Sequence, residues 1–294
     1  MRPMLPRYNN PLNASGRRQS GRVRLSPRRP QGAKPPLISV FLTTPDPMSH
    51  YDFRTPRLHV DERLAAGAEV TLDRDRANYL FNVLRLAAGD PVLLFNGRDG
   101  EWRAEVTSVG KRGGTLTVGD QARAQPAPGR IDLMFAPLKH ARLDYVVQKA
   151  VEMGAARIQP VLTRHTQVAR VNTERMRANV IEAAQQCGVL ALAEVGEPLA
   201  FERTIASLAP ERLVVFCDED ADVADPVAAL NAAPTHDGVA LVIGPEGGFS
   251  EEERAMLLAH GNLVRLSLGP RILRADTAAV AALALVQCVL GDWR

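Results

Sequence analysis

The chain has 294 residues, of which 46 % are apolar and 23 % are charged, as in a soluble globular protein with one large domain or two ordinary ones. This composition argues against collagenous, membrane-spanning and wholly disordered chains. The formal charge is +3, but residues 1–47 carry nine basic residues and one acidic residue, which leaves 27 basic and 32 acidic residues from Met48 onward. The body of the chain is acidic, so contact with a nucleic acid must depend on local basic patches.

The three cysteines, Cys187, Cys217 and Cys288, lie far apart and form no C-x-x-C pair. Their number and spacing indicate neither a disulfide framework nor a zinc site, and we expect no metal. A reducing cytoplasm is the compartment that this cysteine usage favours.

Residues 1–50 form a segment of different composition from the rest. Residues 1–47 contain nine of the 21 prolines, eight arginines and few large apolar side chains, which predicts a disordered basic extension. The residues from Met48 resemble an ordinary protein start, so a misplaced start codon is one interpretation. A solvated tail and a functional arm, either a transit peptide or an RNA-binding arm, are the others.

Residues 51–120 are predicted to form a small β-barrel with one helix. Alternating apolar residues and flanking turn residues predict strands at 58–60, 69–72, 91–95 and 102–109. Apolar residues at helical spacing predict a helix over 79–86, which ends near Gly89. Three arginines in or beside the loops suit contacts with RNA phosphates, although ordinary solvated charge is the alternative. They are Arg74, Arg85 and Arg98.

A Pro- and Gly-containing stretch then changes the composition, and we expect a linker at 121–130. From 131 to 294 apolar strands and amphipathic helices alternate, which predicts a parallel α/β sheet with helices on both faces. The strands are expected at 131–136, 157–162, 212–217, 239–243 and 263–268, and the helices at 143–153, 173–187, 225–231, 251–260 and 277–290. The last helix is apolar almost all round, so we expect it in a core or an interface.

Three loops that directly follow predicted strands are the candidate ligand site, because ligands bind at the carboxyl ends of parallel strands. They span residues 163–166, 244–249 and 268–274. Ser250 and Glu253 form a capping box after the second loop, and Gly247 and Gly248 permit close backbone approach to a ligand. A tight turn without a ligand is the alternative for each loop. None of them has the G-x-G-x-x-G or P-loop pattern, which disfavours dinucleotide and nucleoside triphosphate sites.

The histidines show no metal-ligand spacing and no nucleophile motif. Two of them lie beside basic residues at strand ends and are therefore of interest. His140 follows Lys139, and His165 follows Arg164.

The run LVIGPEGGFS at 241–250 and the run LSLGPRILRADTA at 266–278 resemble the two signature motifs of the RsmE family, the 16S ribosomal RNA uridine N3-methyltransferases. The segments PLK at 137–139, QKAVEMG at 148–154 and EAAQQCG at 182–188 are similar to further family segments. The resemblance extends from about Arg57 to the C-terminus. It implies a SPOUT-type α/β domain with a C-terminal trefoil knot over 131–294 and a PUA-like β-barrel over 51–120.

The resemblance also implies S-adenosylmethionine as the methyl donor, held in a bent pose mainly by backbone groups of the three loops. The donor-binding residues that it implies are Leu162, Thr163, Gly244, Glu246, Gly247, Leu268, Gly269, Ile272 and Leu273. No metal is needed, because a sulfonium is already an activated electrophile.

The same resemblance implies a homodimer that methylates a single uridine near the decoding centre of 16S rRNA in the 30S subunit, with no DNA or membrane partner. Arg271 and Arg274 are candidates for binding phosphate and developing negative charge, and Asp276 is a candidate general base. Lys139 and Arg164 join the three arginines of the barrel as candidate RNA contacts.

Two departures from the family pattern stand in these motifs. Gln185 and Val189 replace the usual carboxylate and guanidinium of EQCGR, and Asp276 replaces a glutamate that is one methylene longer. Two other functions stay open: an RNA-binding factor without catalysis on the same scaffold, and a related methyltransferase with another RNA target.

Overall fold

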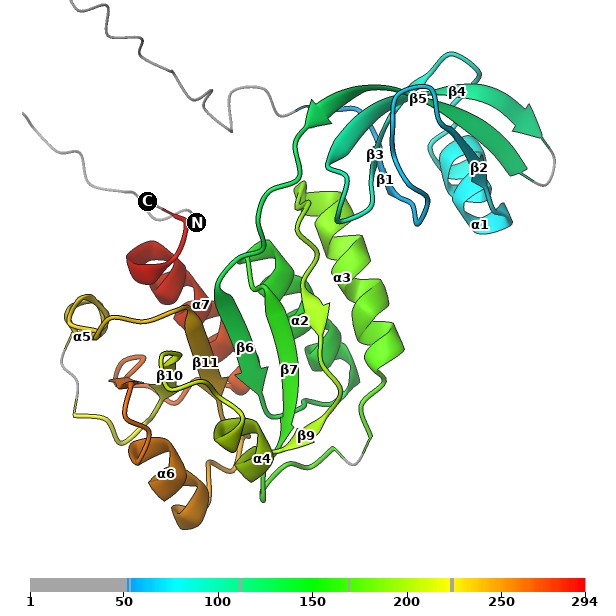
Figure 1. The fold of residues 1–294 in the computed structure, drawn as a ribbon. Helices are drawn as coiled ribbons and strands as arrows, with labels where there is room; N and C mark the ends of the chain where they lie inside the picture. Colours follow the sequence, from blue (N-terminus) through cyan, green and yellow to red (C-terminus); the bar gives the residue numbers. More distant parts are fainter. Residues whose placement is uncertain (1–51, 53, 111–112, 169, 223–224, 294) are drawn as a thin grey trace, which may run out of the picture. The chain divides into compact units, whose positions relative to one another are not determined.

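The computed structural model describes residues 52, 54–110, 113–168, 170–222 and 225–293 (Figure 1). The predictions for residues 1–50 lie outside this part of the chain. In the part that it covers, no helix is both long and apolar enough to cross a membrane.

A five-stranded sheet forms the first part of the described chain. Its strands are β1 (Arg57–His59), β2 (Glu69–Leu72), β3 (Pro91–Phe95), β4 (Glu101–Gly110) and β5 (Gly113–Arg123). The order is β1-β3-β4-β5-β2, and every pair is antiparallel except β1 with β3. This arrangement confirms the predicted β sheet, while its closure into a barrel stays a prediction.

The helix predicted in this sheet differs from the expectation in place and type. It begins as α1 (Arg74–Ala77), capped by the Asp73 carboxylate, and widens into the π-helical turn η1 (Asn78–Val83). The amide of Leu84 donates to the carbonyl of Tyr79, which is a five-residue step. Leu80, one of the apolar residues at helical spacing, lies in the apolar core of this sheet, whereas periodicity did not indicate the wider turn.

Strand β5 was not predicted, and it continues to Arg123, beyond the predicted start of the linker at 121. The β4–β5 ladder contains three register shifts. The unpaired connection to the next strand therefore begins only at residue 124.

The rest of the chain is a parallel sheet. Its strands are β6 (Ile131–Phe135), β7 (Arg157–Leu162), β8 (Glu194–Val195), β9 (Leu199–Ala200), β10 (Leu213–Cys217), β11 (Val239–Ile243) and β12 (Leu263–Leu266). They run in the order β12-β10-β11-β6-β7-β8, with β9 paired to β7, and all pairs are parallel. The short strands β8 and β9 were not predicted, since two residues carry no readable periodicity.

Helices cover both faces of this sheet, as predicted (Figure 1). Along β6, Leu133 packs against one group of helices and Met134 packs against the other, because neighbouring side chains point to opposite faces. The first group comprises α2 (His140–Glu152), α3 (Thr173–Cys187), α5 (Pro226–Asn231) and α7 (Ala275–Leu290). The second comprises α4 (Phe201–Ala206), which was not predicted, and α6 (Glu251–Leu258).

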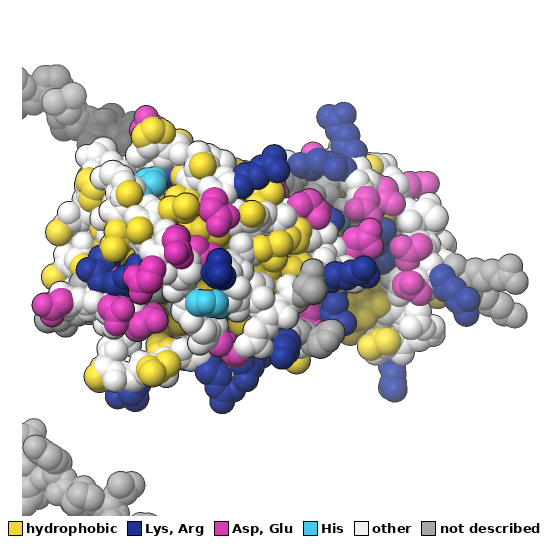
Figure 2. Space-filling model, turned by 90° about the horizontal axis from the view of Figure 1, so that it is seen from below, with side chains coloured by type: hydrophobic (Ala, Val, Ile, Leu, Met, Phe, Trp, Pro, Cys, Tyr) yellow, Lys and Arg dark blue, Asp and Glu magenta, His cyan; other side chains and the backbone are white. Residues whose placement is uncertain are grey.

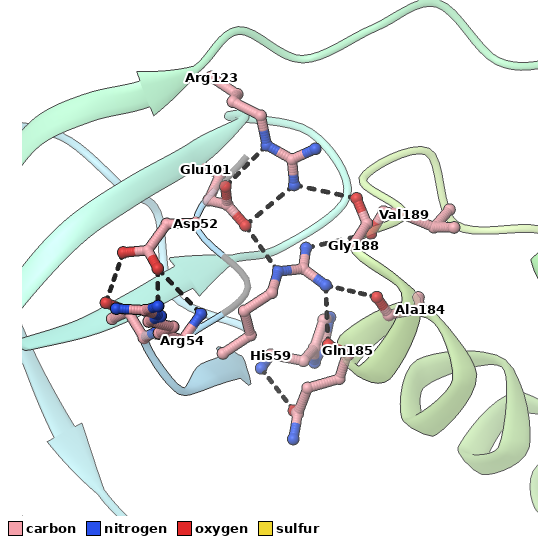
Figure 3. A network of polar contacts seen from close by, with 11 residues as sticks. Asp52, Arg54, His59, Glu101, Arg123, Ala184, Gln185, Gly188 and Val189 are labelled. Atoms are coloured by element: carbon pink, nitrogen blue, oxygen red, sulfur yellow. Dashed lines mark hydrogen bonds and ion pairs between the residues drawn. The ribbon is translucent and has the colours of Figure 1, made fainter. Parts of the chain in front are cut away.

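A buried ionic network joins the β sheet to the C-terminal end of α3 (Figure 3). Glu101 is 2 % exposed and accepts hydrogen bonds from Arg57 at 2.6 Å and from Arg123 at 2.7 Å. Arg57 also donates to the carbonyl oxygens of Ala184 and Gln185, and Arg123 donates to that of Gly188. The carboxylate thus holds two guanidinium groups that satisfy the last carbonyls of the helix.

Gln185 and Val189, which together form the first departure from the family pattern, belong to this network. The side-chain oxygen of Gln185 accepts a hydrogen bond from the amide of His59 at 3.0 Å. The carbonyl of Val189 accepts from Arg57 at 3.3 Å. This departure therefore lies at the contact between β1 and the end of α3, whereas the second one, Asp276, follows the loop after β12.

Replacing Glu101 by glutamine should destabilise the protein by about 3 kcal/mol, because it leaves the buried guanidinium of Arg57 and the part-buried one of Arg123 without their carboxylate. Burial by itself would raise the pKa of Glu101, but the hydrogen bonds from Arg123 and Arg57 outweigh it and lower the pKa below the ordinary 4.5. Because the pKa is lower in the folded protein, the carboxylate stabilises the fold above its ordinary pKa. This stabilisation is lost as the pH falls through the folded-state pKa. Urea unfolding should therefore show the largest difference near neutral pH and a smaller one in acid.

Asp237→Asn is the matched control, because Asp237 pairs with Arg130 where both side chains are mostly exposed. Its effect should stay below about 1 kcal/mol. Equal destabilisation by the two substitutions would contradict the role assigned to Glu101.

Candidate functional site

The loops after β6, β7, β11 and β12 emerge at the carboxyl edge of the sheet, since all these strands are parallel. Beside them lies a cavity of about 380 Å³. Its lining residues come from the start of α2 and from the loops after β6, β7 and β11. They are Pro137, Leu138, Lys139, Ala141, Arg142, His165, Gln167, Val168, Pro245 and Glu246.

Figure 2 views the molecule from below, the side toward which β6 and β7 of the parallel sheet point in Figure 1. Basic and acidic side chains alternate on this face, and apolar side chains lie between them. The face has no broad field of one sign, so charge can select a ligand here only through individual side chains.

The loop after β7 is closed by its own threonines. The amide of Thr163 donates to the hydroxyl of Thr166 at 2.9 Å, and the two hydroxyl groups lie 2.8 Å apart. Thr163 is buried, whereas Leu162 before it is partly exposed. These contacts fix the turn and leave the side chains of Arg164 and His165 exposed at its tip.

The loop after β11 contains the GPEGG motif at 244–248 and is held at both ends. Ser250 and Glu253 form the predicted capping box at the start of α6. Phe249 packs against Phe201 and Phe216 with ring centroids 5.4 Å apart in each pair. A Cβ at Gly244 would lie 2.7 Å from the Phe249 ring, so glycine is required where the loop begins.

Glu253 also joins the β7 and β11 loops. Its side chain is buried, accepts the Ser250 amide at 2.9 Å and accepts the Arg164 amide at 2.8 Å. A second link is made by His165, whose Nδ1 lies 3.0 Å from the carbonyl oxygen of Gly248. The two loops therefore form one fixed surface.

Arg142 of α2 lies between two of the candidate loops. It donates to the carboxylate of Glu246 in the β11 loop, and its Nε lies 3.9 Å from Asp276 at the start of α7. Asp276 also accepts the amide of Thr277 at 2.9 Å, and its side chain is mostly buried. Arg142 therefore joins Glu246 and Asp276, which are 30 positions apart in the sequence.

The loop after β12 presents apolar and basic side chains to solvent. Ile272 is 98 % exposed, and Arg271 and Arg274 are exposed as well. Gly269 has a φ of +97° with open space around its Cβ position, a conformation that favours glycine. Such an exposed isoleucine beside open backbone suits an apolar ligand surface.

Behind these loops a buried carboxylate braces the neighbouring strands. Asp218 follows β10 and binds Arg254 of α6 and Arg265 of β12, the latter at 2.6 Å. Burial would raise the pKa of Asp218, but the hydrogen bonds from both guanidinium groups lower it below the ordinary value. The carboxylate stays charged and ties α6 to the strand that leads into the third loop.

The sequence-based candidates fall into three groups. Lys139 and Glu246 line the cavity, and Gly247 lies against His165, with 3.5 Å from its Cβ position to the histidine Cβ. The β12 loop, from Leu268 to Arg274, contributes none of the residues that line the cavity, although Asp276 after it is tied to Arg142. The three arginines of the β sheet lie on other elements. Arg98 donates to the Asp61 carbonyl at 2.5 Å, while Arg74 and Arg85 are exposed, Arg85 with a φ of +62°.

Arg142 is the site residue that the sequence reasoning missed. It lies in the first turn of α2, which begins at residue 140 rather than at the predicted 143. The basic residues around 139–142 directly after a strand were the available signal. His165 was noted because of its place at a strand end, and it lies in the cavity wall. The side chain of His140 lies outside the described part of the structure.

In the described residues no group of three or more His, Cys, Asp or Glu side chains is placed to hold a metal ion. The arrangement can instead hold an organic ligand between fixed backbone loops and individual charged side chains.

Comparison with known proteins matches both parts of the chain to family models. Residues 125–287 match an RNA methyltransferase domain, and residues 72–119 match an RNA methyltransferase PUA domain. Two curated relatives carry the name ribosomal RNA small subunit methyltransferase E. The protein from Synechocystis is 33 % identical over 239 residues, which cover 80 % of this chain and 78 % of that protein. The protein from Rickettsia conorii is 29 % identical over 232 residues, which cover 79 % and 94 %.

Two solved structures share the fold. A ribosomal RNA small subunit methyltransferase E from Neisseria gonorrhoeae, bound to S-adenosylmethionine, is 27 % identical with a TM-score of 0.71, over 82 % of this chain and 100 % of that one. A putative methyltransferase from Legionella pneumophila, also with bound S-adenosylmethionine, is 30 % identical with a TM-score of 0.68, over 81 % and 99 %. By its two domains and by relatives that match it over most of their length, this chain belongs to the RsmE family of RNA methyltransferases.

Proposed function

We propose that this protein transfers the methyl group of S-adenosylmethionine to N3 of a uridine in small-subunit ribosomal RNA. The observation that carries the proposal is the fixed surface of the β7 and β11 loops beside the cavity, in a chain whose solved relatives contain that donor. The family motifs from which the uridine target is inferred are intact at 244–248 and 268–274.

The residues around the loops fit such a donor. Gly247 and Gly269 are exposed and Gly244 is part-buried, and the partly exposed Leu162 and the exposed Ile272 offer apolar contact. Thr163, Glu246, Leu268 and Leu273 complete the proposed donor site. The donor supplies an activated methyl group on a sulfonium, so the protein has mainly to position it.

The acceptor must be an unpaired or flipped-out base, because Watson–Crick pairing buries N3. In this proposal Arg271 and Arg274 bind a phosphate and the developing negative charge on the base. Lys139 and Arg164 contact RNA next to the cavity, and Arg74, Arg85 and Arg98 contact it on the β sheet. Asp276, predicted from the sequence as the proton acceptor, is one of the candidate bases.

Three further features complete the proposal. The family resemblance supports a trefoil knot formed by the C-terminal elements. Half-buried apolar residues on α7, such as Val280 and Leu285, support a homodimer. A ribosomal substrate supports a cytoplasmic location.

Calorimetry with S-adenosylmethionine should show binding to the purified chain, and labelled methyl groups should then appear on one uridine of 16S rRNA in 30S particles. Free 16S rRNA should be the poorer substrate. Scattered arginines can contact several phosphates at once only when the RNA already has the folded shape that it takes in the 30S subunit. RNA binding without heat from the donor would support the alternative, an RNA-binding factor that does not catalyse.

Gly247→Val should weaken donor binding by about tenfold or more, which is ~1.4 kcal/mol, because the side chain occupies the approach to the loop backbone. Its Cβ would make only an ordinary contact at 3.5 Å with His165, so the folded protein accommodates it. Gly261→Val is the control, since its Cβ position has no neighbour within 4 Å and it lies before β12 at the other edge. Calorimetry measures the donor affinity, and the melting temperature shows whether the variant has lost stability. Equal donor affinities of Gly247→Val and Gly261→Val would refute the assignment of Gly247 to the donor site.

Arg274→Ala should lower turnover by roughly 100-fold while donor affinity is nearly kept, since the guanidinium is assigned to charge that develops on the base. Arg130→Ala, which removes only an exposed ion pair at the start of β6, is the control. Single-turnover methylation of 30S particles gives the rate, and calorimetry gives the affinity. A lost donor affinity with an unchanged rate would reverse the assignment.

A further inference from the structure

His165 is a side chain of the cavity wall that the proposed donor and RNA contacts do not use. His165 lines the cavity together with Lys139, Arg142 and Glu246. It is exposed, and it lies against Gly247 of the β11 loop. Among the described residues its one hydrogen bond joins Nδ1 to the carbonyl oxygen of Gly248 at 3.0 Å.

This hydrogen bond fixes the tautomer of the neutral ring. A carbonyl oxygen can only accept, so Nδ1 must carry the proton and donate it. In the neutral imidazole the other nitrogen, Nε2, then has a free lone pair. No residue of the described chain occupies Nε2 with a hydrogen bond, so the lone pair is available to a ligand.

The other candidate base in the region is less available. Asp276 already accepts the Thr277 amide at 2.9 Å, its other oxygen lies 3.9 Å from Arg142, and its side chain is only 17 % exposed. A carboxylate held by a helix amide and a guanidinium is a weaker proton acceptor than the free nitrogen of a neutral imidazole.

We propose that His165 is the general base that removes the N3 proton of the target uridine. The inference rests on the function proposed above and assigns one step of it. The N3–H bond breaks and its proton goes to Nε2, while the N3 electron pair takes the methyl group and the S–CH3 bond breaks. The products are N3-methyluridine, neutral S-adenosylhomocysteine and an imidazolium that returns its proton to water.

The charges around the ring suit this step. Lys139 on the β6–α2 connection and Arg142 on α2 are cations in the same cavity wall, which favours a uracil anion. Arg164 precedes His165 on its own loop and adds a third cation. Glu246 on the β11 loop is paired with Arg142, and Glu253 of α6 accepts the Arg164 amide, so both carboxylates already have partners.

His165→Asn provides the sharpest test. The asparagine amide can still donate to the Gly248 carbonyl in place of Nδ1, but it offers no basic nitrogen at the position of Nε2. Single-turnover methylation of 30S particles at neutral pH should fall by about 100-fold, with donor affinity within about twofold of wild type by calorimetry. Melting temperature should be unchanged.

The pH profile separates a base from a structural residue. Wild-type turnover should rise with pH to a plateau, as when a group of the protein serves as the base, whereas turnover by His165→Asn should keep rising as hydroxide replaces that base. Added imidazole should raise the methylation rate of His165→Ala by about tenfold. Asp276→Asn should retain the wild-type shape of the profile.

His260→Asn is the matched control, because the Nδ1 of His260 also lies near a backbone carbonyl, that of Asn262 at 3.1 Å, but before β12 at the other edge of the sheet. It should leave rate and profile unchanged. A wild-type rate and profile in His165→Asn, or loss of the acid limb in Asp276→Asn instead, would overturn the proposal for His165. A wild-type protein that binds no donor or methylates no 30S particle would refute the proposed function itself.

Discussion

The parallel direction of the strands is the constraint on which the site depends. Because β6, β7, β11 and β12 all run the same way, the segments that follow them emerge at one edge, although they are separated by up to about 130 residues in the chain. The apolar alternation along each strand also decides which helices cover which face. Loops that are fixed at one end by a buried strand lose little further freedom when they bind a ligand.

Charged groups then fix the loops to one another. Glu253 holds the start of α6 and the Arg164 amide, Arg142 joins Glu246 to Asp276, and Asp218 ties α6 to β12. Glu253 and Asp218 are the most deeply buried carboxylates among them. The hydrogen bonds and ion pairs that they accept offset the cost of removing their charge from water. Such groups keep the site in one geometry. The proposal for His165 depends on a similar contact, the hydrogen bond from its Nδ1 to the Gly248 carbonyl, which holds the ring in place.

Buried ion pairs also attach the five-stranded sheet to the end of α3. Glu101 holds Arg57 and Arg123 against the carbonyl oxygens that end α3, in a region where the chain departs from the family pattern at Gln185 and Val189. The body of the chain is acidic overall, so the RNA contacts proposed here depend on individual exposed arginines and lysines. Under this proposal, selectivity depends on the shape of the RNA more than on long-range attraction.

The sequence by itself determined the parallel sheet, the strands β2, β3, β7 and β11, the helix α3 and the family, because these depend on local periodicity, caps and motifs that are contiguous in the chain. It did not reveal the short elements β8, β9 and α4, or the widening of the helix at Asn78–Val83, whose conformations are set by packing. The bridge from Arg142 to Glu246 and Asp276, and the bond that gives His165 its free nitrogen, were decided only by the tertiary structure. Both join residues on different elements, and a distance between elements has no counterpart in a local pattern of residues.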